Sequence, residues 1–306
     1  MKSLPVVMLA GWMYVSALGA PVWADQANTS AADSASAATP AAQGPQSAAA
    51  PQKQGGASGL FWKWFKMGER VQAEQPGWLS PLATTSGRIK QEFRYDVFQQ
   101  PAAAGGTDYN FGGGKGLEFI VAPSLQLLVG PPPYIAHTGR AANGFGDVPV
   151  MMKFRVAAAG AKEGNYLLTL LFSATAPGGT NAMRDAVLSP GIAAGKGWGN
   201  FDVQTTLAGN FPTGDTAALG RQLVSNTAFQ YAVFSKLWPE LEVNSTFFLT
   251  GKNSGETQVF LTPGLGFGRV RVWRALKFST AAGMQIAATR FHTYNHRAIF
   301  SVRYSF

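Results

Sequence analysis

The chain has 306 residues, a formal net charge of +9 and no cysteine, which excludes disulfides. Charged residues make up 13% of it, against about 25% in typical soluble domains, while 36 residues are glycine and 12% are aromatic. The basic residues are scattered singly and form no cluster with aromatic residues, so a nucleic-acid-binding protein is not expected.

The N-terminus has the features of a secretory signal. Lys2 precedes an apolar run over residues 5–20, and Val22 and Ala24 supply the small residues that precede a cleavage site. We therefore expect a signal peptide over residues 1–24, cleaved near Ala24. No later stretch has the roughly 20 consecutive apolar residues of a spanning helix, so a helical membrane protein is not expected.

Two further segments precede the strand-like part of the chain. Residues 25–59 are almost entirely Ala, Ser, Gln, Pro, Thr and Gly, a composition that predicts a disordered periplasmic linker. Residues 60–77 form a short amphipathic segment in which aromatic and basic residues alternate. It contains Phe61, Trp62, Lys63, Trp64, Phe65, Lys66 and Arg70. Either this segment is a helix that lies in the headgroups of the inner leaflet or plugs a pore, or it packs on the base of a barrel.

After Gly87 the apolar residues recur with a period of two, which is typical of β-strands. The C-terminal strand is the clearest example, because its apolar residues alternate with Arg297, Ser301, Arg303 and Ser305. Such alternation is expected when one face meets lipid and the other a polar lumen. The apolar set at this end includes Phe300, Val302, Tyr304 and Phe306. It resembles the terminal aromatic pattern that the outer-membrane assembly machinery reads.

Further strands are predicted at about 88–98, 117–129, 147–158, 165–176, 186–196, 200–211, 222–234, 238–249, 256–268 and 274–289. Eleven strands conflict with the even number found in bacterial single-chain barrels, so one more is expected over 78–86. The predicted fold class is all-β, a transmembrane antiparallel up-and-down β-barrel over residues 78–306 with twelve strands. Ten strands are the alternative, if residues 187–196 form a loop. Short and long connections alternate, which places the C-terminus in the periplasm.

The faces of these strands predict which side chains line the lumen. The charged candidates are Lys90, Glu92, Arg94, Asp96, Glu118, Lys153, Arg155, Asp202, Glu240, Glu242, Lys277, Arg297 and Arg303. Seven are basic and six are acidic. This near balance predicts cross-strand ion pairs in a modest lumen rather than a pore with a field of one sign. The pairs are either purely structural or line a route for a small polar or amphipathic solute.

Few residues suggest catalysis or metal binding. His292 and His296 lie in RFHTYNHR without a nearby carboxylate, and two ligands fall short of the three or four of a zinc site. Ser301 lies one strand length from His296, so a hydrolase site is a minor alternative. We predict no catalytic residue, no metal and no cofactor.

Several runs resemble a known family. They are QEFRYDVF, GFGDVPVMMKFR, GNYLLTLLFSATAPGG, SPGIAAGKGWGNFDVQTTLAGNFPTGD, NTAFQYAVFSKLWPELEVN and QVFLTPGLGFGR. They are similar to outer-membrane proteins of the MetA-pathway of phenol degradation, over roughly residues 80–306. The resemblance implies an outer-membrane barrel with a transport role. It carries over no ligand-binding residue, because these runs are structural parts of hairpins.

The alternating strands and this resemblance together predict a passive channel or transporter in the outer membrane of a Gram-negative bacterium. Its cargo would be small compounds, aromatic or hydrophobic ones included. The expected partners are the lipid bilayer, the outer-membrane assembly machinery and a small solute of unknown identity. Two alternatives are a structural or adhesive barrel whose linker reaches a periplasmic partner, and an outer-membrane enzyme.

Overall fold

The computed structural model describes residues 57–102, 105–113, 115–183, 185–234, 236–273 and 276–306. The signal peptide expected over 1–24 lies outside these residues, as does the expected linker except for residues 57–59. Helix α1 begins there and spans Ala57–Ala73. Among the described residues, no helix has both the length and the apolar character needed to cross a membrane.

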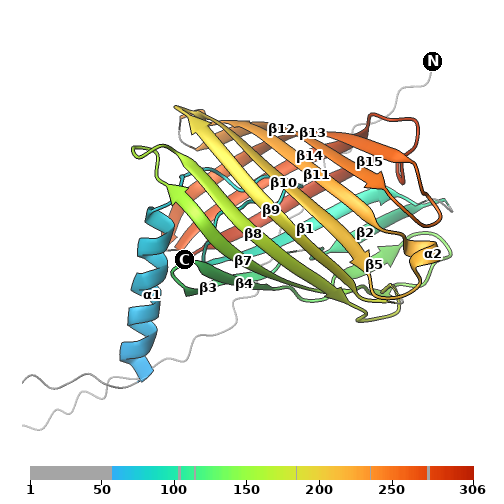
Figure 1. Cartoon of the computed structure of the whole chain (residues 1–306), viewed down its shortest axis with the longest axis horizontal. Helices are drawn as coiled ribbons and strands as arrows, with labels where there is room; N and C mark the ends of the chain where they lie inside the picture. Colours follow the sequence, from blue (N-terminus) through green and yellow to red (C-terminus); the bar gives the residue numbers. More distant parts are fainter. Residues whose placement is uncertain (1–56, 103–104, 114, 184, 235, 274–275) are drawn as a thin grey trace, which may run out of the picture. The chain divides into compact units, whose positions relative to one another are not determined.

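Within the described ranges, twelve strands close into one antiparallel barrel (Figure 1). They are β1 (Glu92–Pro101), β3 (Leu117–Ala122), β4 (Leu125–Val129), β7 (Val148–Ala159), β8 (Tyr166–Ala176), β9 (Val187–Trp198), β10 (Phe201–Pro212), β11 (Gln222–Tyr231), β12 (Leu237–Phe248), β13 (Thr257–Trp273), β14 (Leu276–Ala287) and β15 (His296–Ser305). Each pairs with the next, and β1 closes the ring on β15 from Glu92 opposite Ser305 to Gln99 opposite Ala298. The predicted fold class and strand number are confirmed.

Three shorter strands extend the wall beside β1. β2 (Thr107–Phe111) pairs with the second half of β1, while β3 pairs with its first two residues. β5 (Tyr134–His137) pairs with β2, and β6 (Gly144–Phe145) pairs with β5. Glycines separate β2 from β3, and three consecutive prolines separate β4 from β5. Because proline cannot donate a ladder hydrogen bond, this part of the wall is interrupted.

Three details of the predicted strands are wrong. The single strand expected over 117–129 is the hairpin β3–β4, whose turn contains Pro123. Residues 78–86 are not a strand, because their backbone is bound by side chains inside the barrel. These two errors cancel, so the strand number stays twelve. The ten-stranded alternative is also wrong, since Val187–Trp198 forms β9.

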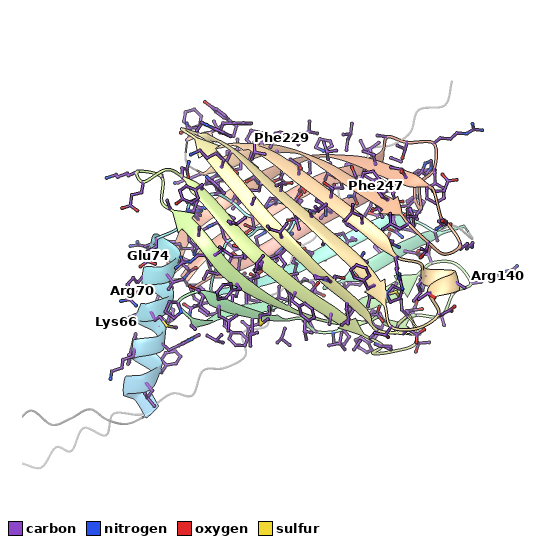
Figure 2. The ribbon with its side chains drawn as sticks, viewed as in Figure 1. Lys66, Arg70, Glu74, Arg140, Phe229 and Phe247 are labelled. Atoms are coloured by element: carbon purple, nitrogen blue, oxygen red, sulfur yellow. The ribbon has the colours of Figure 1, made fainter. Side chains whose placement is uncertain are left out.

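The outside of the barrel is apolar. Phe229 and Phe247 project outward (Figure 2), and Leu207 and Phe300 are 45% and 42% exposed. Exposed apolar side chains occur on all twelve barrel strands, which far exceeds the isolated apolar patches of water-soluble proteins. Polar side chains fill the interior. This is the arrangement of a transmembrane barrel, with lipid outside and a polar lumen.

The two ends of the barrel differ. At the turn end, connections such as residues 160–165 and 199–200 are short, and the C-terminus and α1 lie there (Figure 1). At the loop end, longer connections include helix α2 (Thr216–Leu219).

Helix α1 packs on the turn end through its second half. The indole Nε1 of Trp64 donates a hydrogen bond to the carbonyl of Ile120 at 2.6 Å. Val71 forms a buried cluster with Ile89 and Ile120. Packing on the barrel base, one of the two interpretations, therefore describes this half. The first turns differ, since Leu60, Phe61 and Trp62 are 71%, 55% and 56% exposed and the lipid interpretation is open there.

Candidate functional site

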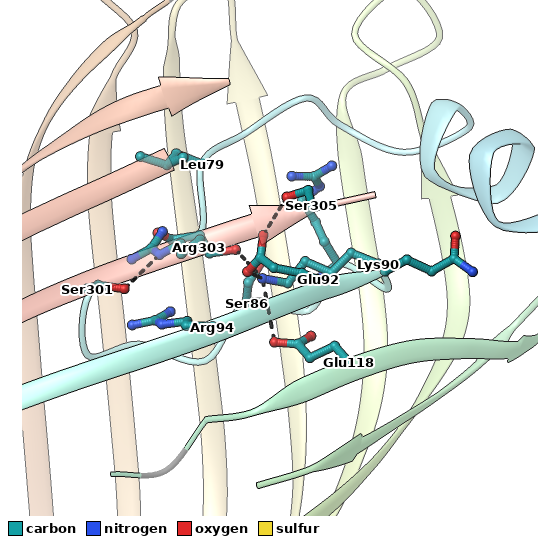
Figure 3. Close-up of polar contacts among 12 residues, drawn as sticks. Leu79, Ser86, Lys90, Glu92, Arg94, Glu118, Ser301, Arg303 and Ser305 are labelled. Carbon is teal, nitrogen blue, oxygen red and sulfur yellow. Dashed lines mark hydrogen bonds and ion pairs between the residues drawn. The ribbon is translucent and has the colours of Figure 1, made fainter. Parts of the chain in front are cut away.

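The lumen contains a segment of the chain that is not part of the wall. Residues 75–91, here called the plug, connect α1 to β1, and most of their side chains are buried. Within the described ranges, no residue from 76 to 90 makes a backbone–backbone hydrogen bond. The plug is therefore held by side chains, most of which belong to the surrounding strands (Figure 3).

Two arginines of neighbouring strands bind the deepest part of the plug. Arg94 on β1 donates from Nη1 to the carbonyl of Pro81 at 2.9 Å and from Nη2 to that of Leu82 at 2.6 Å. Arg303 on β15 donates to the carbonyl of Ser80 and, at 3.3 Å, to that of Pro81. Both guanidiniums are almost fully buried. Their Nη groups thus donate to peptide carbonyls, while Nε of Arg94 donates to Asp96 and Nε of Arg303 to Ser301.

A second pair of guanidiniums meets at the turn end of the plug. Arg88 Nη1 donates to the carbonyl of Trp78 at 2.5 Å, and Arg269 donates to the same oxygen. Arg269 sits at a bulge in β13 between Gly268 and Val270, with a backbone φ of +61°. This bulge adds an inward side chain that regular alternation would place in the wall's outer face. The left-handed backbone of a non-glycine residue is strained, and such strain clusters at functional sites.

The opposite wall binds the plug through acceptors and hydroxyls. Both carboxylate oxygens of Glu242 are used, since Ala83 N donates to Oε1 at 2.8 Å and Thr84 N to Oε2 at 2.5 Å. The hydroxyls of Thr206 and Thr169 donate to plug carbonyls at 2.7 Å each. The plug therefore presents carbonyls to arginines on one side and amide N–H groups to a carboxylate on the other.

The buried charges near β1 are paired, some within one stretch of chain and some between strands. Lys90 contacts Glu92 and lies 3.5 Å from Glu118, while Arg94 and Asp96 are 2.8 Å apart on one strand. Lys153 Nζ lies 3.2 Å from Glu118 across the intervening β4. Two of these contacts join residues two apart on the same face of the chain, where cross-strand pairs were expected. Pairing of this kind is required because charges buried together must be compensated.

Ten of the thirteen lumen candidates are buried in the structure. They are Lys90, Glu92, Arg94, Asp96, Glu118, Lys153, Asp202, Glu240, Glu242 and Arg303. Asp202 accepts from Gln204, and Glu240 accepts from Gln230. The other three lie at the ends of the barrel. Arg155 binds Glu74, which directly follows α1; Lys277 is exposed at the turn end, and Arg297 lies at the loop end against the ring of Tyr294.

Chambers lie on both sides of the plug. A pocket of about 580 Å³ at the turn end is lined by Trp78, Arg88 and Arg269 among others. At the loop end, pockets of about 560 Å³ and 340 Å³ share Phe98 and Arg297 in their lining. The lumen is thus hollow at both ends and filled in the middle.

The histidines do not form a catalytic or metal site with the residues predicted for them. Ser301 accepts from Arg303 at 2.9 Å inside the barrel, whereas His296 is exposed at the loop end. Five residues of extended strand separate them by about 16 Å. His137 Nδ1 instead lies 2.6 Å from Asp108 in the loop-end pocket. Among the described residues, no group of three or more His, Asp or Glu could hold a metal ion.

The sequence alone does not predict the plug, its Arg88 or the wall residue Arg269 that binds it. Over residues 78–86, apolar and polar residues alternate for too short a stretch to distinguish a strand from an inserted segment. The strand predicted from residue 88 includes Arg88, and the pattern assigns Arg269 to no face, because a bulge cannot be recognised from a period of two. Pro81 was the one available signal, since proline is rare inside strands.

Comparison with solved structures bears on the fold. An outer-membrane channel from Pseudomonas putida F1 aligns with a TM-score of 0.51 and 12% identity, over 75% of this chain and 100% of that chain. The chain has the fold of an outer-membrane β-barrel. The KdgM porin aligns with a TM-score of 0.45 and 13% identity over 70% and 99%, and the NanC porin with 0.46 and 6% over 69% and 98%. No protein-family model and no curated protein matches the chain.

Proposed function

We propose that the protein is a passive channel of the outer membrane that conducts small solutes, and that the plug is its gate. The observation that carries this proposal is the arrangement of the lumen, with open chambers at both ends separated by an inserted segment. A barrel whose only role was structural or adhesive would have no need of matched chambers on the two sides of a removable segment.

The plug is attached in a way that permits release. Its backbone belongs to no sheet, so it can leave without breaking any strand pairing of the barrel. Each bond between neutral groups contributes roughly 0.5–1.5 kcal/mol net, and each bond to a charged side chain about 1.5–3 kcal/mol, because water can replace a lost partner. Segments held in this manner open at lower free energy than the strands around them.

Location and orientation are part of the proposal. The lipid-facing belt supports insertion in a bilayer, and the N-terminal signal expected over 1–24 supports export. The short connections at the turn end support a periplasmic position for α1 and the C-terminus, with the loop end outside. Kinship with the MetA-pathway barrels rests on the sequence runs alone. An aromatic or hydrophobic cargo is likewise proposed only from that resemblance.

A reversible tether tests the gate. A side chain at Gly266 on β13 would lie 3.6 Å from Leu79 Cγ, and the natural chain has no cysteine. The pair Leu79→Cys and Gly266→Cys is therefore expected to form a single disulfide between plug and wall. Conductance in planar bilayers should be lost on oxidation and should return on reduction.

Two controls give this experiment its meaning. Each single cysteine variant should conduct equally in oxidant and reductant. Equal conductance of the oxidised and reduced pair would show that the plug is not the gate. If neither the reduced pair nor a plug-loosened variant ever conducts, the channel proposal itself is wrong.

A further inference from the structure

We infer that the solute of this channel is a small carboxylate with an apolar tail, and that it passes along the surfaces that now bind residues 78–82 of the plug. This inference rests on the proposed channel function. It deepens that function by assigning the chemical class of the cargo.

The first argument concerns the guanidiniums. Arg269 and Arg303 of the barrel wall bind plug carbonyls, and no carboxylate of the described residues lies within 4.0 Å of either guanidinium. Guanidinium binds carboxylate more strongly than a neutral carbonyl, often through two parallel bonds. The plug carbonyls therefore occupy positions that suit a carboxylate better.

The second argument concerns the apolar side chains of the plug. Leu82 is 1% exposed and packs with Ala281 and Ile299. A Cβ added at Gly264 or Gly283 would come within 2.6 or 2.5 Å of its Cδ1. The missing side chains of these glycines thus leave the space that Leu82 fills.

Leu79 is accommodated in the same way. A Cβ at Gly266 would approach Leu79 Cδ2 to 2.2 Å, so this leucine also occupies space left by a glycine of β13. Arg303 binds the carbonyls of Ser80 and Pro81, between the two leucines in sequence. When the plug leaves, an apolar site remains next to a buried guanidinium. An apolar tail with a carboxylate head matches this combination.

The third argument is the distribution of charge around the barrel. On β8 to β12 the inward charged residues are Asp202, Glu240 and Glu242, and all are acidic. On the facing arc, the arginines of β13 and β15 lie without a carboxylate within 4.0 Å among the described residues. The total is balanced, yet the two sides differ in sign. The resulting field directs an anionic head toward β13, β15 and β1.

The test uses the full-length protein with a plug loosened by neutral changes. Thr169→Val with Thr206→Val removes two plug hydrogen bonds and leaves the lumen charge unchanged. Reversal potentials in planar bilayers then give the permeability of butyrate, acetate and phosphate relative to chloride. Butyrate should be the most permeable of the three. Adding Arg303→Gln should lower its relative permeability about tenfold, through loss of charge-assisted bonds.

Matched variants separate the lumen from the rest of the surface. Lys196→Gln removes the same charge at a half-buried position of β9, where Lys196 lies over the ring of the exposed Tyr166, and should leave the permeability ratios unchanged. Arg269→Gln serves as the second lumen variant if Arg303→Gln does not fold, and it should also lower the butyrate ratio.

Each outcome is decisive. If the permeability ratios are the same with and without either arginine substitution, the inference is overturned, while the channel function stands. Phosphate passing as well as butyrate assigns the route to oxyanions in general and overturns the carboxylate with an apolar tail. If no current flows in the loosened variant, the proposed function fails and the inference falls with it.

Discussion

The guanidinium of Arg269 donates a hydrogen bond to the backbone carbonyl of Trp78, 191 residues earlier in the chain. The same guanidinium lies 5.3 Å from the ring of Trp238. A bulge with φ of +61° aims it there. A non-glycine residue in this conformation costs about 1–2 kcal/mol. The wall is therefore strained at the place where it grips the plug.

Two substitutions of Arg269 separate the effect of its hydrogen bond to the plug from the effect of its strained backbone. Arg269→Ala and Arg269→Gly both remove the bond to Trp78, so both should expose the plug to trypsin, which can cut after Arg88 and Lys90. In urea unfolding, the free energy of unfolding of the glycine variant should exceed that of the alanine variant by about 1 kcal/mol, because glycine adopts positive φ freely. Equal protection of the wild type and both variants from trypsin would show that Arg269 does not hold the plug.

The barrel could be predicted because alternation is repeated along every long strand. A period of two fixes both the strand and the face, and the aromatic C-terminal strand shows it clearly from Phe300 to Tyr304. A period of two does not predict where a strand is interrupted by a turn. Pro123 divides one apolar run into a hairpin, and the sequence around it alternates on both sides of the turn.

The plug could not be predicted from the sequence, for a different reason. Its bonds join residues far apart in sequence, such as Thr84 and Glu242, which are separated by 158 positions. Only the closed barrel brings them together. Glu242 was predicted to face the lumen, but that it binds backbone N–H groups of an inserted segment required the structure.

Glu242 should control the opening of the deep end of the plug. Glu242→Gln replaces one acceptor oxygen by a donor amide facing the N–H groups of Ala83 and Thr84. Hydrogen bonds to charged groups contribute about 1.5–3 kcal/mol, so exchange of these two amides should accelerate about ten- to a hundredfold. Hydrogen exchange with mass spectrometry measures this on the plug peptide.

Glu240→Gln is the matched control, because Glu240 accepts from Gln230 and makes no hydrogen bond to the plug. Its plug peptide should exchange at the wild-type rate. Similar acceleration in both variants would mean that loss of lumen charge, and not the bonds of Glu242, frees the plug.

The lipid and lumen faces can be compared at one height in the barrel. Leu207 points outward and is 45% exposed, while Asn226, paired opposite Thr206, lines the loop-end pocket of about 340 Å³. Leu207→Arg should destabilise the folded barrel in bilayers by up to about 2–4 kcal/mol, because its charge meets lipid. Asn226→Arg should destabilise the barrel far less. It loses one hydrogen bond of 3.3 Å, from Asn244, and its charge lies in a polar cavity. Urea unfolding in liposomes that gives equal losses for the two would contradict this assignment of faces.

The C-terminal residues should act in assembly more than in stability. Tyr304 and Phe278 face each other across β14 and β15 with ring centroids 5.4 Å apart. Tyr304→Ala and Phe278→Ala each remove the same ring contact, worth about 0.5–1.5 kcal/mol, so refolding in detergent should suffer equally. Only Tyr304 belongs to the proposed assembly signal, which also includes Phe300, Val302 and Phe306. The amount of folded barrel in the membranes of expressing cells should therefore fall further for Tyr304→Ala. Equal amounts of the two variants in cells would remove the special role of this strand end.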